Sequence, residues 1–200
     1  MDDGRVHVRD DEPLRRRRLA VFFRLLLYVP HEIVLGGWTV IASPLVAIAW
    51  LALLIEGRLP GWLHSFIAAY VRYTGQVTAW FFLLSGRYPD PLHTQAHPFA
   101  IEIPDRPRQP RLITLFRALL AIPALLLATA LRVVLSLAAV PAWFAGVALG
   151  RTTAGLQELG AFCLRYELEV TAYTLLLTAT YPRLVPARSR PSPATGLPAA

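Results

Sequence analysis

The sequence repeats itself at an offset of 93 residues, and this feature constrains the fold more than any other. Residues 19–89 align with residues 112–182 without a gap, with 24 identities in 71 positions. The rarer residue types carry this result: Arg24 aligns with Arg117, Pro30 with Pro123, Trp50 with Trp143, Gly57-Arg58 with Gly150-Arg151, Arg72-Tyr73 with Arg165-Tyr166, and Tyr88-Pro89 with Tyr181-Pro182. We therefore expect an internal duplication whose two copies fold alike.

The composition places this duplicated unit in a membrane. Hydrophobic residues make up 55% of the chain and charged residues only 16%, whereas soluble domains carry about 25% charged residues. This balance excludes an ordinary soluble enzyme and a disordered chain. The stretch Ile33–Ile55 contains no charged residue and is long enough to cross a bilayer with some tilt.

Each copy contains three apolar pieces with helical character. They are 19–29 and 112–122, then 31–55 and 124–149, then 62–85 and 155–178. The first piece is too short to cross a hydrocarbon core of about 30 Å, so it is an interfacial helix or the bent start of the second piece. The second piece spans. The third carries internal charges, so two alternatives stay open: a second spanning helix with its polar face inside a bundle, or an amphipathic helix on the membrane.

The predicted fold class is therefore an all-α membrane protein with two tandem repeats, supplemented by short β-strand segments near 5–8 and 98–103. The strands are inferred from alternating apolar and polar residues. The predicted organisation is a cytoplasmic lead-in (1–18), membrane repeat 1 (19–89), a cytoplasmic linker (90–111), membrane repeat 2 (112–182) and a disordered tail (183–200).

Clusters of arginine predict the topology. They lie before the first apolar run (15–18), in the joint between the repeats (86–111) and in the C-terminal tail. The positive-inside bias then places both termini and the joint in the cytoplasm. Four crossings follow, with the repeats sharing one orientation about an axis along the membrane normal. The alternative is a tight hairpin near Gly36-Gly37, with the third piece on the membrane surface.

Charged residues within apolar pieces are the candidate functional residues, because such charges are costly in a bilayer and are usually paired. The candidate membrane-embedded polar site comprises Arg72, Arg165, Glu167 and Glu169. It is either an anion or headgroup site, or an internal ion pair. We expect Arg165 to pair with Glu169 or a neighbouring acid, and Arg132 to need a partner. The expected interfacial anchors are Arg24, Arg117, Arg58 and Arg151.

No sequence pattern indicates catalysis. A nucleophile with its base, a metal-ligand cluster and a phosphate-binding loop are all missing from the sequence. His93 and His97 lie between prolines, with Asp90 as the one nearby acid, which is too few ligands for a metal site. We expect no enzyme activity, no catalytic residue, no cofactor and no metal. The arginine blocks flank apolar runs, so nucleic acid is not an expected partner.

The spacing of the repeated residues resembles a known family. Each copy has an Arg and a Pro before a long apolar run, which in the first copy ends in Ile48-Ala49-Trp50 and Glu56-Gly57-Arg58. Arg72-Tyr73 and a closing Tyr88-Pro89 follow. This pattern is similar to the uncharacterised bacterial membrane family called domain of unknown function 4389, here in two tandem copies. The second copy departs from the first in lacking an equivalent of Pro60. The resemblance implies a bacterial plasma membrane and no particular reaction.

These observations predict a non-enzymatic integral membrane protein, a scaffold or accessory subunit, with several crossings and cytoplasmic termini. The alternative is a small transporter or channel with an anion or lipid-headgroup site between the repeats. The expected partner is the lipid bilayer, together with another membrane protein or a second copy of the chain.

Overall fold

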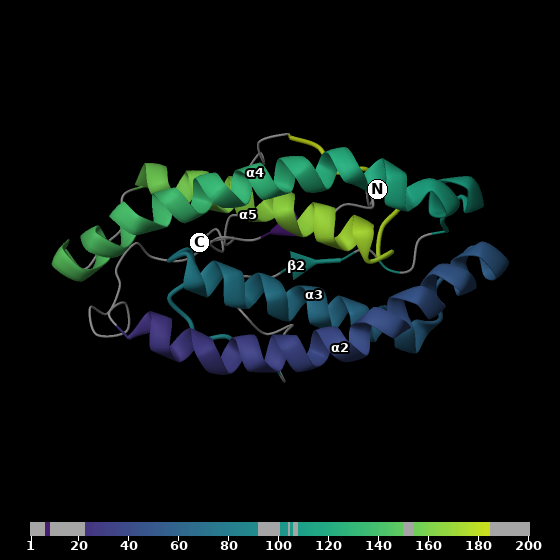
Figure 1. The fold of residues 1–200 in the computed structure, drawn as a ribbon, viewed down its shortest axis with the longest axis horizontal. Helices are drawn as coiled ribbons and strands as arrows, with labels where there is room; N and C mark the ends of the chain where they lie inside the picture. The colour runs from purple at the N-terminus through teal and green to yellow at the C-terminus, as the bar shows by residue number, and fades with distance from the viewer. Residues whose placement is uncertain are drawn as a thin grey trace, which may run out of the picture.

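The computed structural model describes residues 7–8, 23–91, 101–103, 105, 108–149 and 154–184. Within these ranges it contains four helices, which are α2 (Arg24–Glu56), α3 (Gly61–Phe81), α4 (Arg111–Leu149) and α5 (Ala154–Thr174). In Figure 1 the long helices α2 and α4 form the two flanks of the molecule, and the shorter α3 and α5 lie between them. The bounds of α3 and α5 differ by 93 residues at both ends, which is the offset of the sequence repeat.

The long helices are continuous, and this corrects two expectations. Pro30 and Pro44 lie inside α2, and Pro123 and Pro141 lie inside α4. The first apolar piece is therefore the start of the long helix rather than a separate interfacial helix. The hairpin alternative near Gly36-Gly37 is also wrong, because both glycines lie within α2. A proline inside a helix removes one backbone hydrogen bond, which the long apolar helix on either side tolerates.

The third helix of each repeat ends four residues earlier than the sequence predicted. Leu83 and Leu176 adopt left-handed φ values of 64° and 68°. The amide of Leu84 donates to the carbonyl of Ala79 at 2.8 Å, and the amide of Leu177 donates to that of Ala172 at 2.9 Å. This is a Schellman ending, with leucine where glycine is usual. Both leucines are buried, so their packing offsets the cost of a left-handed backbone.

Gly57 ends α2 as a left-handed cap, with φ 71° and its amide donating to Leu53 at 2.9 Å. The strands are short: β1 (His7–Val8) pairs antiparallel with β2 (Ile101–Glu102). Most of the predicted strand segments near 5–8 and 98–103 lies outside the described residues, so strands of that length stay a prediction.

The two repeats pack antiparallel to each other. The start of α4 lies beside the end of α2, where the amide of Gln109 donates to the carbonyl of Gly57 at 3.0 Å and the Trp50 indole donates to the carbonyl of Thr114 at 3.0 Å. At the other end, Leu84 after α3 packs against Gly160 of α5. A half-turn about an axis perpendicular to the helices therefore relates one repeat to the other (Figure 1).

The core lies between the central helices. Leu63, Ile67 and Val71 of α3 pack in one buried cluster with Leu164 and Leu168 of α5. Ile103, a described residue between the repeats, also packs against this cluster.

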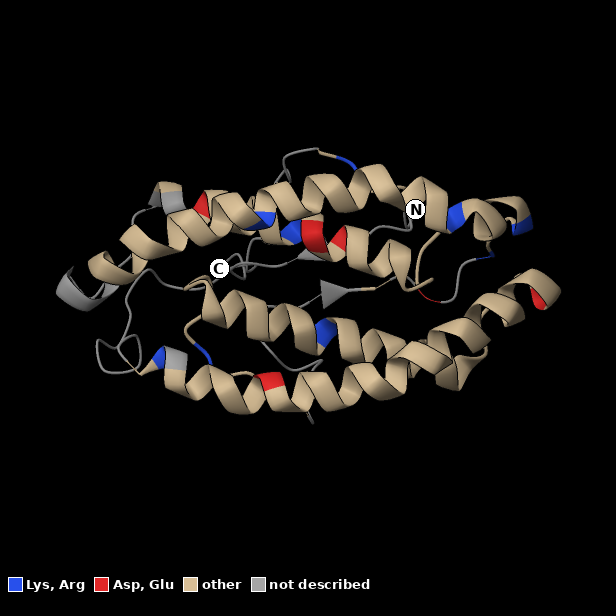
Figure 2. Cartoon of the chain, viewed as in Figure 1, with Lys and Arg blue, Asp and Glu red and all other residues tan. Residues whose placement is uncertain are grey.

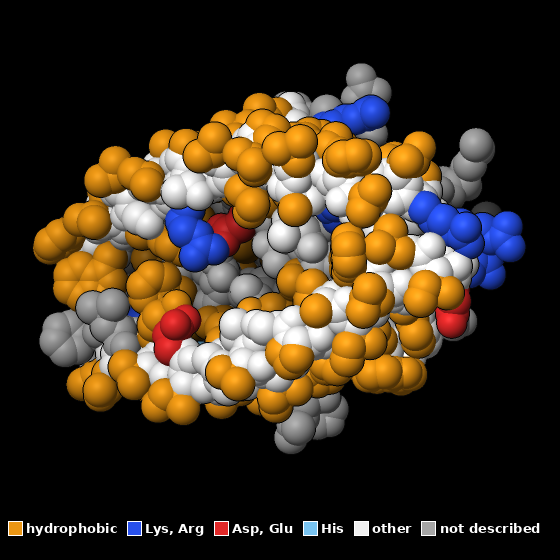
Figure 3. All heavy atoms as spheres, turned by 45° about the vertical axis from the view of Figure 1, so that its right-hand side comes forward, with side chains coloured by type: hydrophobic (Ala, Val, Ile, Leu, Met, Phe, Trp, Pro, Cys, Tyr) orange, Lys and Arg blue, Asp and Glu red, His pale blue; other side chains and the backbone are white. Residues whose placement is uncertain are grey.

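Apolar exposure is concentrated on the long helices. Among the described residues, α2 carries 10 exposed large hydrophobic side chains and α4 carries 14, whereas α3 and α5 carry one each, Trp62 and Leu159. Figure 3 shows hydrophobic side chains gathered along both ridges of the surface, with a hollow between them. The segments Leu26–Glu56 and Arg111–Ala145 are long and apolar enough to cross a membrane, as judged by length and composition.

Candidate functional site

A buried arginine holds the open end of each helical hairpin. Arg24 at the start of α2 donates through Nη1 to the carbonyl of Trp80, near the end of α3. Arg117 donates through Nη1 to the carbonyl of Tyr173 near the end of α5, at 2.9 Å. Both arginines are only 3% exposed. The last carbonyls of a helix lack intrahelical partners and carry partial negative charge, so a guanidinium is well placed there.

Aromatic rings complete these two arginine clasps, which we define as Arg24 with Trp80 and Arg117 with Tyr173. The Arg24 guanidinium carbon lies 4.8 Å from the centre of the Trp80 ring, and that of Arg117 lies 4.7 Å from the Tyr173 ring. Both distances fall within the range of cation–π attraction. Tyr88 packs edge-on against Trp80 and Tyr181 against Tyr173, with centroids 5.4 and 5.5 Å apart.

These clasps correct the prediction that Arg24 and Arg117 are interfacial anchors. Their sequence neighbours are apolar, which suits an interface, but their side chains are buried against the carbonyls of Trp80 and Tyr173. Arg58 is exposed just after the Gly57 cap, and its role as an anchor stays a prediction. Arg151 lies outside the described residues.

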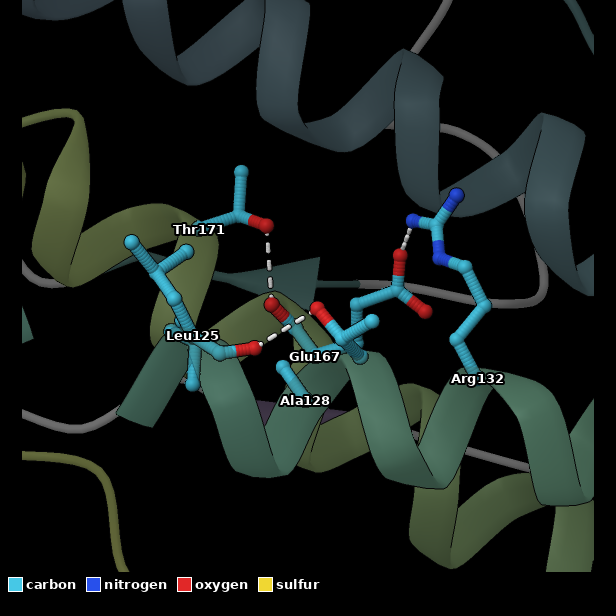
Figure 4. Close-up of a pocket in the computed structure, with 7 residues that line it drawn as sticks. Leu125, Ala128, Arg132, Glu167 and Thr171 are labelled. Atoms are coloured by element: carbon cyan, nitrogen blue, oxygen red, sulfur yellow. Dashed lines mark hydrogen bonds and ion pairs between the residues drawn. The ribbon is translucent and has the colours of Figure 1, made fainter. Parts of the chain in front are cut away.

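A second polar feature is present in repeat 2. Arg132 of α4 and Glu167 of α5 form an ion pair, with side chains 56% and 10% exposed. Figure 4 shows their side chains reaching toward each other beside a pocket, and Thr171 donating to the backbone carbonyl of Glu167. The pocket has a volume of about 330 Å³ and is also lined by Leu125 and Ala128. Arg132 thus has the partner that an arginine in an apolar helix requires.

The corresponding positions of repeat 1 are neutral. Thr39 aligns with Arg132 and Thr74 with Glu167. The Thr39 hydroxyl donates to the carbonyl of Leu35 at 2.7 Å and lies 2.9 Å from the Tyr70 hydroxyl. The sequence thus places an ion pair in one repeat where the other has hydroxyl groups.

The predicted pairing of Arg165 is confirmed. Its Nε donates to Glu169 at 3.3 Å, one helical turn away, with side chains 15% and 10% exposed. The other carboxylate oxygen of Glu169 accepts from the amide of Arg183 at 3.3 Å. In repeat 1, Gln76 replaces Glu169 and its side-chain oxygen accepts from the amide of Asp90, also at 3.3 Å. Glu169 and Gln76 therefore hold the chain that leaves each hairpin, and Arg165 neutralises the acid.

The four residues of the predicted polar site serve two different pairs. Glu167 joins Arg132, and Glu169 joins Arg165. Arg72 is partly buried on α3, and burial lowers its pKa from the usual arginine value. In Figure 2 the acidic residues of α5 lie beside basic residues near the middle of α4 and α5.

Repeat 1 contains an aromatic cluster that the sequence analysis missed. The His31 Nδ1 and the Tyr73 hydroxyl are 2.6 Å apart, and both residues are buried. Burial raises the pKa of Tyr73 to about 12, so the hydroxyl keeps its proton at neutral pH. The ring of His31 also packs 4.6 Å from that of Tyr88. Ala124 takes the place of His31 in repeat 2.

A signal for these contacts was present in the repeat. Residues identical in both copies belong to the clasps, as Arg24 and Arg117 do, or pack against their rings, as Tyr88 and Tyr181 do. Identity between copies marks positions whose neighbours are also duplicated, and the clasps are such positions.

These features define a class of two-repeat helical proteins, in which each repeat is a clasped hairpin with one long apolar helix. Residues 18–93 and 111–184 each match the family described as Domain of unknown function (DUF4389). The chain belongs to this family and carries two tandem copies of its domain, as the sequence resemblance predicted. Comparisons with curated proteins and with solved structures returned no match.

Proposed function

We propose that this protein is a non-enzymatic membrane protein, a scaffold or accessory subunit held in the bacterial plasma membrane by α2 and α4. The observation that carries the proposal is the exposed apolar surface of these helices. Only 17% and 22% of the residues in their most apolar windows are buried within the chain. Monomeric soluble proteins rarely expose apolar surface on this scale, and lipid would cover it here.

Membrane retention tests this proposal directly. Leu119 and Leu126 are 65% and 68% exposed on α4. The double variant Leu119→Glu, Leu126→Glu should move a large part of the chain from the membrane to the soluble fraction, because each buried charge is costly in lipid. The matched control is Arg108→Glu, which changes the net charge by the same two units at an exposed linker position. The parent chain appearing in the soluble fraction would contradict the proposal.

The scaffold role rests on the arrangement of polar groups. Several buried polar side chains hold helix ends and connecting segments, as the clasps and Glu169 do. Such groups stabilise a shape without presenting a nucleophile or base to a substrate. Native electrophoresis after mild detergent extraction should show a complex larger than the single chain. Turnover of a defined substrate by the purified chain would refute the non-enzymatic role.

A second candidate function is a small transporter or channel with an anion or lipid-headgroup site. The observation that favours it is the pocket beside Arg132 and Glu167, whose arginine is more than half exposed. A guanidinium in such a place can bind phosphate or carboxylate groups. Proteoliposomes should then show anion flux or lipid transfer that Arg132→Gln reduces. Equal rates in empty liposomes and proteoliposomes would remove this candidate.

A further inference from the structure

We infer that the protein lies in one leaflet with its helix axes parallel to the membrane plane, so that the apolar flanks of α2 and α4 contact the acyl chains of that leaflet. This inference rests on the proposed membrane location and specifies how the membrane is engaged. Four observations carry it: the apolar stripe on each long helix, the length of the whole exposed apolar surface of these helices, the antiparallel packing of the repeats, and the two ends that the linker joins.

Each long helix carries a stripe of exposed apolar residues spaced seven apart, which places them on one helical face. On α2 these are Leu26, Ile33 and Val40, at 69%, 70% and 74% exposure. On α4 the residues at the 93-residue offset are Leu119, Leu126 and Val133, at 65%, 68% and 55%. The same face is therefore unpartnered in both repeats, as expected for a surface that both repeats turn to the same solvent.

The apolar surface is too long for an upright helix. Exposed large hydrophobic residues extend from Leu26 to Ile55 on α2 and from Leu112 to Phe144 on α4. At 1.5 Å per residue these stretches measure about 45 and 50 Å, whereas the hydrocarbon core is about 30 Å thick. Keeping both stretches inside that core would need a tilt of about 50°, which exceeds the usual range of about 0–40°.

The antiparallel packing of the repeats gives the linker a path that an upright orientation cannot accommodate. The chain leaves α3 beside Gly160 and enters α4 beside Gly57, at the opposite end of the helices. Between these points Ile103 packs on the central helices. If the helices stood upright, this segment would cross the bilayer on the outside of the helices. Its sequence includes Arg87, Asp90, Glu102, Asp105, Arg106 and Arg108.

Irregular polar backbone exposed to lipid is not tolerated at membrane depth. With the helix axes in the membrane plane, the linker joins the two ends of the helices without having to cross the hydrocarbon core. The half-turn that relates the repeats then runs along the membrane normal, so both apolar stripes lie at one depth. The four-crossing topology would instead require α4 to begin at the end where α3 finishes, and it begins at the other end.

The charges on the long helices are compatible with this position. Arg132 enters the leaflet as a pair with Glu167, and Glu32 accepts a hydrogen bond from Tyr28. Intramembrane charges are normally paired in this way or face a cavity. Figure 3 shows a basic and an acidic side chain beside each other in the hollow between the apolar ridges, with further charged side chains at the right-hand end and the upper edge.

Depth measurements along α2 test the inference. Single cysteines at Leu26, Ile33 and Val40 would carry a nitroxide label in vesicles of phosphatidylethanolamine and phosphatidylglycerol. The parent chain serves as the background control, because its one cysteine, Cys163, is buried. We expect all three labels at one depth, with high access to oxygen. A progressive change of about 10 Å between successive positions would show an upright helix and overturn the inference.

Labelling from the two sides of sealed vesicles provides an independent readout. Arg58 lies beyond the end of α2 and Arg87 beyond the end of α3, both exposed and at opposite ends of one hairpin. The variants Arg58→Cys and Arg87→Cys should react with an impermeant maleimide from the same side. Reaction from opposite sides would overturn the inference while leaving the membrane location intact. If the nitroxide labels on the stripe showed low access to oxygen and broadened one another's spectra, a second copy of the chain would cover the stripe. That result would also overturn the inference.

Discussion

Repeat 1 and repeat 2 use the same residues at the open end of the hairpin and different residues along its middle. Both have a buried arginine on a helix carbonyl, an aromatic ring over that arginine and a left-handed leucine after the helix. Along the middle the aligned residues differ. His31 of repeat 1 corresponds to Ala124 of repeat 2, and Thr39 and Thr74 correspond to Arg132 and Glu167. The shared end holds two helices together in any copy, whereas the divergent middle lies where the repeats meet different surroundings.

This comparison shows which polar groups are structural. A contact kept at both copies of a duplicated unit is needed to form that unit. A contact present in one copy is not needed by the other, so it can be removed without unfolding that other copy. Substitutions that replace a residue of one repeat by its counterpart in the other therefore distinguish contacts shared by both copies from contacts present in one copy.

The largest expected effect is at Arg165. Arg165→Leu leaves the Glu169 carboxylate, which is 10% exposed, without its cation. We expect a loss of about 3 kcal/mol in unfolding free energy, as for other broken buried pairs. Adding Glu169→Gln reproduces the neutral Gln76 of repeat 1 and should restore at least about 1 kcal/mol. Circular dichroism during denaturation in detergent micelles measures both.

The control for Arg165 is the matching change in repeat 1. In repeat 1 the neutral Gln76 stands at the position of Glu169, and for Arg72→Leu we expect a loss of about 1 kcal/mol. Equal and small losses for Arg72→Leu and Arg165→Leu would show that the Arg165 pair is solvated in the membrane-bound protein.

The two arginine clasps should respond alike. Arg24→Met and Arg117→Met each remove a guanidinium from a helix carbonyl and an aromatic ring, and should each cost about 2–3 kcal/mol. Arg117 also donates through Nη2 to Gln109. Arg58→Met, at an exposed position, is the control and should be nearly neutral. If Arg24→Met left the unfolding free energy unchanged while Arg117→Met lowered it, the clasp would be essential in repeat 2 alone. That result would contradict the view that the two repeats depend on the same contact.

The sequence predicted the repeated unit better than it predicted contacts within it. The starts of α3 and α5 were predicted to within one residue, because Gly57-Arg58 and its copy mark the preceding turn. Their ends were missed, because the left-handed residues Leu83 and Leu176 are not turn-forming types. The pair of Arg165 with Glu169 was predictable because the two residues are one helical turn apart.

Contacts between distant residues could not be predicted in this way. The carbonyl that binds Arg24 belongs to Trp80, 56 residues further along the chain. An arginine beside an apolar run suits both a membrane interface and a buried helix end, and local sequence does not separate the two. The prediction that the two repeats share one orientation was wrong, because they pack antiparallel. Similar copies reveal a shared fold but not their mutual direction.

The smallest expected effect concerns His31, which repeat 2 replaces with Ala124. Because an alanine is compatible with the same fold in that repeat, His31→Ala should leave the hairpin intact. It removes the hydrogen-bond partner of the buried Tyr73 hydroxyl, so we expect a loss of about 1–2 kcal/mol in unfolding free energy. Tyr73→Phe in the His31→Ala background removes the orphaned hydroxyl and should recover part of that loss. Strictly additive effects of the two substitutions in a double-mutant cycle would show that the hydrogen bond contributes nothing, and that the aromatic cluster of repeat 1 is held by ring packing alone.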